Sequence, residues 1–214
     1  MEMNQFLTLF ADSVDRLNQQ VPAFENQGNQ YKPGIGPYGE DNIVDLVIND
    51  IVSGTMPSNI HIRPGAPVRR ELGLNNYVGV NGRAATPDLV VDNNLIEFKI
   101  CRPLRDNGER EDTWFKKVFE PNPQSYSTFL DVIKLCRFRD QYDPERKWNP
   151  WVVVIGFERQ NETDYILDQY FPDLYGHIST NMVQLPYRHF LSFTRDMGTR
   201  HPYHQVLKLY GFGY

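Results

Sequence analysis

Two carboxylates and one amine, Asp88, Glu97 and Lys99, lie on one short stretch of the sequence. This stretch contains two runs rich in branched and aromatic side chains, Leu89–Val91 and Leu95–Ile100. The Asp and Asn residues between the runs tolerate the positive φ angles of a tight turn, so the pattern predicts a β-hairpin. Because successive side chains of a strand point to opposite faces, Glu97 and Lys99 share one face, opposite to the apolar residues that alternate with them. Asp88, at the start of the partner strand, is then close enough to join them.

These residue types suit one kind of chemistry. Two carboxylates about one hairpin width apart can hold a hard divalent cation such as Mg²⁺ and leave positions for water and a phosphate oxygen. Lys99 on the same face can orient the attacking water or help to deprotonate it, and its ammonium can stabilise the charge that develops on phosphorus. The residues therefore predict metal-dependent cleavage of phosphodiester bonds. The alternative is a solvent-exposed hairpin that carries an ordinary Glu–Lys pair.

A helix is expected just before the hairpin region. Residues 39–52 repeat apolar side chains at helical spacing after a run of Pro and Gly, and Glu40 falls on the apolar face near the start. Glu40 therefore either points inward and joins the site or acts as a first-turn acid that interacts with the helix dipole. Asp45 and Glu71 are the next candidates for an additional acid.

Further elements are expected on both sides of the hairpin. Residues 124–138 again show helical spacing, and the continuous apolar run 151–157 is typical of a strand that is covered on both faces. The first strand of the sheet lies in 59–68 or 77–80, where prolines and glycines obscure its limits. The predicted order is helix, strands, helix, strand.

Pro87-Asp88 followed by Glu97-Phe98-Lys99 resembles the signature of the PD-(D/E)XK nuclease superfamily, which includes many restriction endonucleases. The resemblance covers approximately residues 39–157. It implies an α/β fold with a restriction endonuclease-like core, αβββαβ, in which helices flank a central mixed sheet. Here the core would carry N- and C-terminal additions.

The resemblance also implies a role for each site residue. Asp88 and Glu97 would bind the metal, with the Phe98 backbone carbonyl as a further ligand. Lys99 would position the water nucleophile. Glu40 would either complete the site or contact the residues that bind the metal. The implied cofactor is Mg²⁺, for which Mn²⁺ can substitute.

The chain is expected to form a single nuclease domain over residues 1–214. Residues 1–32 suggest an N-terminal helical extension, with an amphipathic helix over 6–17. Residues 158–214 suggest an accessory region rich in Tyr, Phe and His, which would form an extra layer, a dimer surface or a recognition element. Cys101 and Cys136 have neither a disulfide nor a zinc spacing and are expected to be buried, reduced thiols.

The net charge of −5 is unusual for a protein that binds nucleic acid, but the span 63–147 holds slightly more Lys and Arg than Asp and Glu. Interspersed acids also allow this region to be a self-neutralising surface. The basic residues that follow the hairpin are candidate phosphate contacts: Arg102, Arg105, Arg110, Lys116, Lys117, Lys134, Arg137 and Arg139.

Other chemistry-bearing residues receive a structural interpretation. The long connection after Lys99 carries Trp114, Phe115 and Phe119, which are expected to anchor the connection, with base stacking as the alternative. The histidines show no simple metal-ligand geometry and are expected to be surface or packed residues: His61, His177, His189, His201 and His204.

The leading hypothesis is a Mg²⁺-dependent endonuclease that hydrolyses DNA, of the type II restriction type, with DNA as partner and a homodimer that cuts both strands. The alternatives are a repair, recombination or phage-type nuclease that acts on structured or single-stranded nucleic acid, and a catalytically silent module for nucleic-acid binding or assembly. RNA stays an alternative substrate, although the absence of a histidine at the site argues against the cap-snatching branch of the superfamily. No membrane span or secretory signal is predicted, so the expected location is intracellular, in the cytoplasm.

Overall fold

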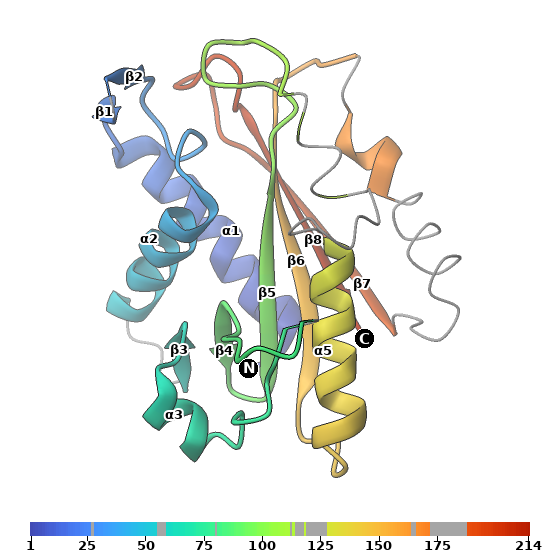
Figure 1. Cartoon of the computed structure of the whole chain (residues 1–214). Helices are drawn as coiled ribbons and strands as arrows, with labels where there is room; N and C mark the ends of the chain where they lie inside the picture. The colour runs from blue at the N-terminus through green and yellow to red at the C-terminus, as the bar shows by residue number, and fades with distance from the viewer. Residues whose placement is uncertain are drawn as a thin grey trace.

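The computed structural model describes residues 1–26, 28–54, 59–79, 81–111, 113, 118, 128–163, 166–171 and 188–214, with the backbone alone at Phe129. Figure 1 labels the helices α1 (Met3–Gln20), α2 (Glu40–Ser53), α3 (Ala66–Glu71) and α5 (Thr128–Tyr142). It labels the strands β1 (Phe24–Asn26), β2 (Asn29–Tyr31), β3 (Ile60–Ile62), β4 (Leu89–Val91), β5 (Asn94–Cys101), β6 (Asn149–Glu158), β7 (His189–Asp196) and β8 (Val206–Gly213).

The main sheet is mixed and has six strands in the order β3-β4-β5-β6-β8-β7. The neighbours β3, β4 and β5 run antiparallel, β5 and β6 run parallel, and β8 is antiparallel to both β6 and β7. Helix α5 provides the crossover between the two parallel strands, as a parallel pair requires. The α/β class with a mixed central sheet is therefore confirmed.

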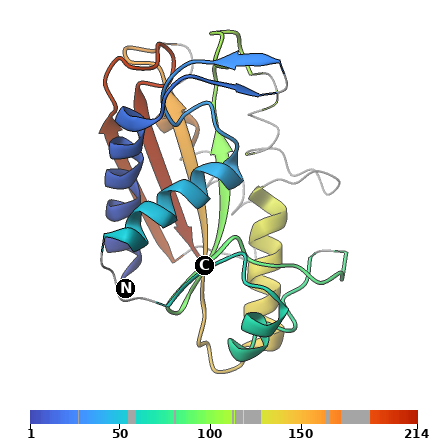
Figure 2. The ribbon, with the colours of Figure 1, turned by 90° about the vertical axis from the view of Figure 1, so that its left-hand side faces the viewer.

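Helices cover both faces of this sheet. Figures 1 and 2 show α1 and α2 on one face and α5 on the other. Two apolar clusters fill the layers, one between the sheet and the α1–α2 layer and one beneath α5. On β5, Ile96 and Phe98 face α1 and α2, where the Phe98 ring stacks on Phe10 with centroids 5.4 Å apart, whereas Leu95 faces α5. The predicted alternation of side chains along this strand is confirmed.

The elements expected around the hairpin are present with small shifts at their ends. The hairpin forms β4 and β5, and Asp92 in its turn has the positive φ angle of 49° that the turn requires. The helix predicted over 39–52 is α2, the strand predicted over 151–157 is β6, and the helix predicted over 124–138 is α5, whose first predicted residues lie outside the described range.

The prediction for the first strand was wrong in part. Only Ile60–Ile62 pairs with β4, and Ala66–Glu71 forms a helix. Pro67 lies in the first turn of this helix, where the missing amide hydrogen costs no hydrogen bond. Val78 forms an isolated bridge with Ala84 and belongs to no labelled strand. The prolines that suggested a broken strand therefore mark the start of a helix.

The two ends of the chain contribute to the same sheet and its cover. The predicted N-terminal helix is longer than expected, Met3–Gln20, and packs on β7, β8 and α2. The region predicted to be accessory supplies β7 and β8, and β8 lies between β6 and β7. The core therefore extends beyond residue 157. Both cysteines are free and buried, as expected, and among the described helices none has the length and apolarity to span a membrane.

The segment that follows β5, 102–111, is held by two buried histidines. The rings of His201 and His204 stack with centroids 4.1 Å apart. His201 Nε2 lies 2.8 Å from Asp106 Oδ1, and His204 Nε2 donates to the Leu104 carbonyl oxygen at 2.9 Å. Backbone amides donate to Nδ1 of His201, so its proton is on Nε2. These histidines are packed residues, as the sequence predicted.

Burial of this pair makes the stability of the fold depend on pH. Burial lowers the pKa of His201 and lowers that of His204 well below its ordinary value, and the neighbouring ring lowers the latter further. An unfolded imidazole titrates near pH 6.5, so below that pH the unfolded chain binds more protons than the folded chain and stability falls. We expect the free energy of unfolding, measured with urea, to fall from pH 7 to pH 5 by up to about 1.4 kcal/mol per pH unit for each histidine.

A pair of variants isolates this contribution. His204→Gln keeps an N–H group for the Leu104 carbonyl and cannot titrate, so its stability should fall less steeply with acidification than that of the wild type. His189→Gln removes an exposed histidine from β7 and should leave the slope unchanged. A wild-type slope in His204→Gln would contradict the assignment.

Candidate active site

The predicted site residues lie at an edge of β5 that β4 leaves uncovered. The strand β4 pairs only with the first part of β5, and its last pair is Leu89 with Ile96. Pro87 has no amide hydrogen and cannot extend this ladder. The backbone groups of Phe98 and Ile100 therefore need partners other than a strand.

Carboxylates take the place of the missing strand. Asp88 Oδ2 accepts a hydrogen bond from the Phe98 amide at 2.8 Å, and Glu40 Oε2 accepts one from the Ile100 amide at 2.8 Å. Glu40 reaches this edge from the first turn of α2. In a ladder the N–H and C=O of one residue face the same neighbour, so the Phe98 carbonyl faces the same space as its amide. Three groups that were predicted to bind the metal through oxygen, Asp88, Glu40 and the Phe98 carbonyl, thus lie together at this edge.

Glu97 lies on the face of β5 that α5 covers, and only 2 % of it is exposed. The Tyr77 hydroxyl donates to Glu97 Oε1 at 2.5 Å, and Lys134 Nζ lies 2.8 Å from the same oxygen. The exposed-hairpin alternative is therefore wrong, because Glu97 is buried and pairs with a lysine from α5 rather than with Lys99.

Lys99 connects the two sides of the site. Its Nζ lies 2.7 Å from Asp131 Oδ2 on α5 and 3.9 Å from Glu40 Oε1 on α2, and it donates to the Phe98 carbonyl at 2.9 Å. Asp131 also contacts Lys134 through Oδ1 at 3.1 Å. Asp131 therefore bridges the two ammonium groups, and the cluster spans both helical layers across the strand edge.

Burial and mutual repulsion shift the acids in the same direction. Burial raises the pKa of Glu97 well above its ordinary value, and the Asp88 carboxylate raises it further. Burial raises the pKa of Glu40 to about 7, although Lys99 acts in the opposite direction. Burial disfavours the charged form of Lys99, but Asp131 and Glu40 outweigh it and raise its pKa. Lys99 therefore stays an ammonium group, and Glu40 can exchange a proton near neutral pH.

The charge of the cluster matches a divalent cation. Its members are four acids and two lysines, which leave an excess of two negative charges when all are ionised: Glu40, Asp88, Glu97, Asp131, Lys99 and Lys134. Within the described part of the chain, Asp88 Oδ1 and Glu97 Oε2 accept no hydrogen bond, so each keeps an oxygen for a ligand. Hard oxygen donors of this kind fit Mg²⁺.

The acids of the cluster are not arranged around one point as the ligands of a bound metal are. Among the described residues no three His, Cys, Asp or Glu side chains are arranged to hold a metal ion. The ammonium groups of Lys99 and Lys134 stand among the carboxylates instead. The donor set and the charge therefore fit a divalent cation, whereas a change in side-chain positions has to accompany its binding.

The structure adds residues that sequence reasoning missed. Tyr77 and Asp131 were not predicted, and Lys134 was expected to contact phosphate rather than to lie inside the cluster. Asp131 and Lys134 each precede a buried residue of α5, Val132 and Leu135. Polar residues three apart at the border of a buried helical stripe are the sequence signal that would have indicated these two residues. No comparable pattern marks Tyr77.

The other candidate acids lie apart from the cluster. Asp45 pairs with Arg63 at 2.7 Å, and the same arginine also pairs with Asp41. Glu71 is exposed at the end of α3. Of the candidate acids, Glu40 is therefore the one that reaches the open edge.

The candidate phosphate contacts take different places. Arg102 is largely buried and donates to two backbone carbonyls just before α2, at 2.8 and 3.1 Å, so it holds the chain that leads into that helix. Arg105 lies 3.9 Å from Glu111, and Arg139 lies 2.9 Å from Asp140. Several predicted residues lie outside the described range: Trp114, Phe115, Lys116, Lys117, Phe119 and His177.

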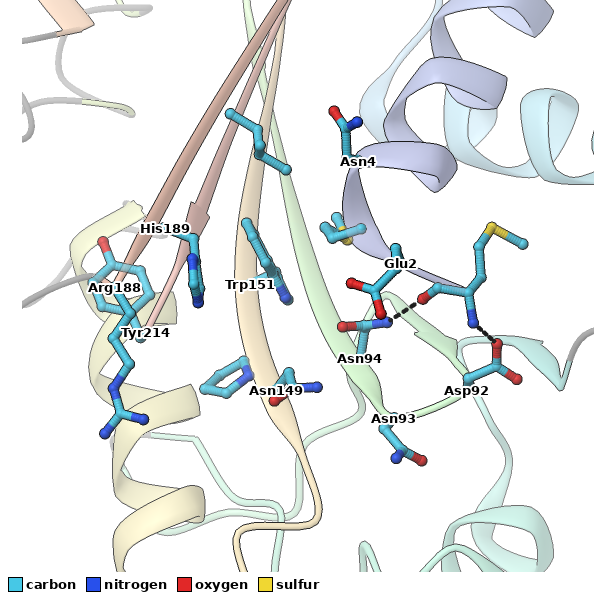
Figure 3. A pocket seen from close by; sticks show the side chains of 15 residues that line it. Glu2, Asn4, Asp92, Asn93, Asn94, Asn149, Trp151, Arg188, His189 and Tyr214 are labelled. Atoms are coloured by element: carbon cyan, nitrogen blue, oxygen red, sulfur yellow. Dashed lines mark hydrogen bonds and ion pairs between the residues drawn. The ribbon is translucent and has the colours of Figure 1, made fainter.

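Two hollows in the surface lie away from the acids of the cluster. One of about 470 Å³ opens at the start of β5 and β6 and is lined by asparagines and the aromatic side chains of Trp151, His189 and Tyr214 (Figure 3). Another, of about 380 Å³, lies between the β1–β2 hairpin and 102–111 and includes Arg102. Neither of these two hollows is lined by Asp88, Glu97 or Lys99.

Fold and site together define an α/β protein with a carboxylate–lysine cluster at an open strand edge. Comparison with protein-family models, with curated proteins and with solved structures gives no match. The chemistry of the cluster is therefore derived from its own geometry.

The Tyr77–Glu97 contact gives a direct test of this geometry. Tyr77→Phe removes a buried donor from an acid and should lower the free energy of unfolding by about 1 to 3 kcal/mol. Urea denaturation at pH 7.5 measures the change. Tyr142→Phe removes the hydroxyl of a tyrosine that is 44 % exposed and should have no effect. Equal stabilities of the two variants would show that the Tyr77 contact is not formed.

Proposed function

We propose that the protein is a metal-dependent endonuclease that hydrolyses phosphodiester bonds in DNA. The observation that carries the proposal is that Asp88, the residue before β4, and Glu40, from α2, lie beside Glu97 and Lys99 of β5. Burial of these acids beside one another disfavours their charged forms, and a bound cation would offset that free-energy cost.

The element order supports the same assignment. Helix α2 precedes the antiparallel strands β3, β4 and β5, and α5 then leads to β6. This is the αβββαβ order that a restriction endonuclease-like core has, with α1, β7 and β8 as additions. Asp88 directly precedes the second strand of that order, β4, and Glu97, Phe98 and Lys99 lie on the third, β5.

The residues divide the chemistry among them. Asp88, Glu97 and the Phe98 carbonyl would hold Mg²⁺, which would provide a Lewis acid for a phosphate oxygen. Lys99 keeps its ammonium charge and stabilises the negative charge that grows on the phosphoryl oxygens as water attacks phosphorus. Glu40 accepts the proton that this water loses. The bond from phosphorus to the leaving oxygen breaks, and solvent protonates that oxygen.

Cleavage assays on variants test the assignment. Lys99→Ala and Asp88→Ala should each lower the cleavage rate by about 100- to 1,000-fold, because each removes a charge that acts on the transition state. Supercoiled plasmid and phage DNA are incubated with Mg²⁺, Mn²⁺ or EDTA, and circular dichroism verifies the fold of each variant. Glu71→Ala removes an exposed acid from α3 and serves as the matched control.

Each outcome of this assay has a meaning. Discrete, metal-dependent bands that disappear in both variants support a restriction-type enzyme, for which we expect a homodimer in sedimentation because two strands need two active sites. Nicking or a smear favours a nuclease for structured or single-stranded substrates. Parental activity in both variants would refute the assignment, and inactivity on every DNA would favour RNA or a silent binding module.

A further inference from the structure

Lys134 forms an ion pair with Glu97, an acid that is predicted to bind the metal. Its Nζ is 2.8 Å from Glu97 Oε1 and 3.1 Å from Asp131 Oδ1. The lysine side chain is 13 % exposed and that of Glu97 is 3 % exposed, so solvent screens their attraction weakly. The ammonium group is thus an internal cation bound to a predicted metal ligand.

A metal ion bound to either oxygen of the Glu97 carboxylate, including the free Oε2, would lie close to this ammonium group. Both are positively charged, and at contact distance in a partly buried site their repulsion is strong. Lys134 has a second acceptor, because Asp131 lies three residues earlier on α5 and already contacts it. The lysine can therefore leave Glu97 without losing every counter-charge.

We propose that Lys134 is a displaceable counter-ion, which holds Glu97 in the cation-free protein and moves onto Asp131 when a divalent cation binds. The inference rests on the proposed metal-dependent function. It accounts for a cluster that has the charge and donors for a divalent cation but no three acids arranged around one point among the described residues. Lys134 is then a positioning residue for Glu97, and Asp131 is the acceptor that makes the movement possible.

Binding of Mn²⁺ to the purified protein tests the exchange without any substrate. Lys134→Gln removes the charge and keeps a hydrogen-bond donor, so Mn²⁺ should bind at least about tenfold more tightly than in the wild type. Isothermal titration calorimetry and the paramagnetic resonance signal of free Mn²⁺ measure the dissociation constant. Lys134→Arg keeps the charge and should bind no more tightly than the wild type.

A control separates displacement from a general effect of charge. Arg139→Gln removes one positive charge from the same helix, but Arg139 pairs with Asp140 and not with the cluster. Its dissociation constant for Mn²⁺ should remain close to that of the wild type. Equal tightening in Arg139→Gln and Lys134→Gln would overturn the displacement model.

Two further measurements keep the test decisive if Lys134→Gln folds poorly without a cation. The melting temperature of the variant should then rise more with Mn²⁺ than that of the wild type, because tighter binding stabilises the folded state more. In the wild type labelled with ¹³C-lysine, the Cε signal that disappears in Lys134→Arg should shift on addition of Mg²⁺.

Failure of the proposed role of Lys134 and failure of the proposed metal site give different results in these experiments. An unmoved Lys134 signal in a protein that binds Mg²⁺, or equal Mn²⁺ affinity in the wild type and Lys134→Gln, overturns the role of Lys134 and leaves the proposed nuclease intact. Absence of Mn²⁺ binding in the wild type and in every variant overturns the metal site and with it the proposed function.

Discussion

The architecture of the candidate site depends on one unmet need for hydrogen bonds. β5 continues beyond its last pair with β4, and the amides of Phe98 and Ile100 then face an uncovered edge. Asp88 and Glu40 satisfy them with carboxylate oxygens. The same contacts that complete the sheet therefore concentrate negative charge beside the strand. If β4 continued along β5, its backbone would supply these hydrogen-bond partners, and the two carboxylates would not be needed there.

The charged residues at this edge also connect the helices on the two faces of the sheet. Asp131 comes from α5 and Glu40 comes from α2, so the ion pairs of Lys99 connect helices on opposite faces of the sheet, whereas Lys134 links α5 to β5. Buried ion pairs often add little net stability, because desolvation offsets the attraction. Net stability alone therefore does not account for these ion pairs, and the proposed binding of a cation would give them a role.

Local signals in the sequence predicted the central elements well. Alternation along β5, the turn at Asp92 and the helical spacing after Gly39 depend on neighbours in the chain, and each gave the correct element. The open edge of β5 and the contacts of Glu97 with Tyr77 and Lys134 did not follow from the sequence, because they depend on which distant segments pack together. The first strand was misjudged because Pro67 fits a helix start as well as a broken strand.

The position of β8 has a consequence for the way the chain acquires its structure. β6 is buried almost throughout, and along one side its ladder is formed with β8, which lies about fifty residues later in the sequence. During synthesis, this apolar strand emerges from the ribosome well before its antiparallel neighbour exists. Until then its free side is a template for pairing with other chains. Pairing with β8, once it has been synthesised, removes this template.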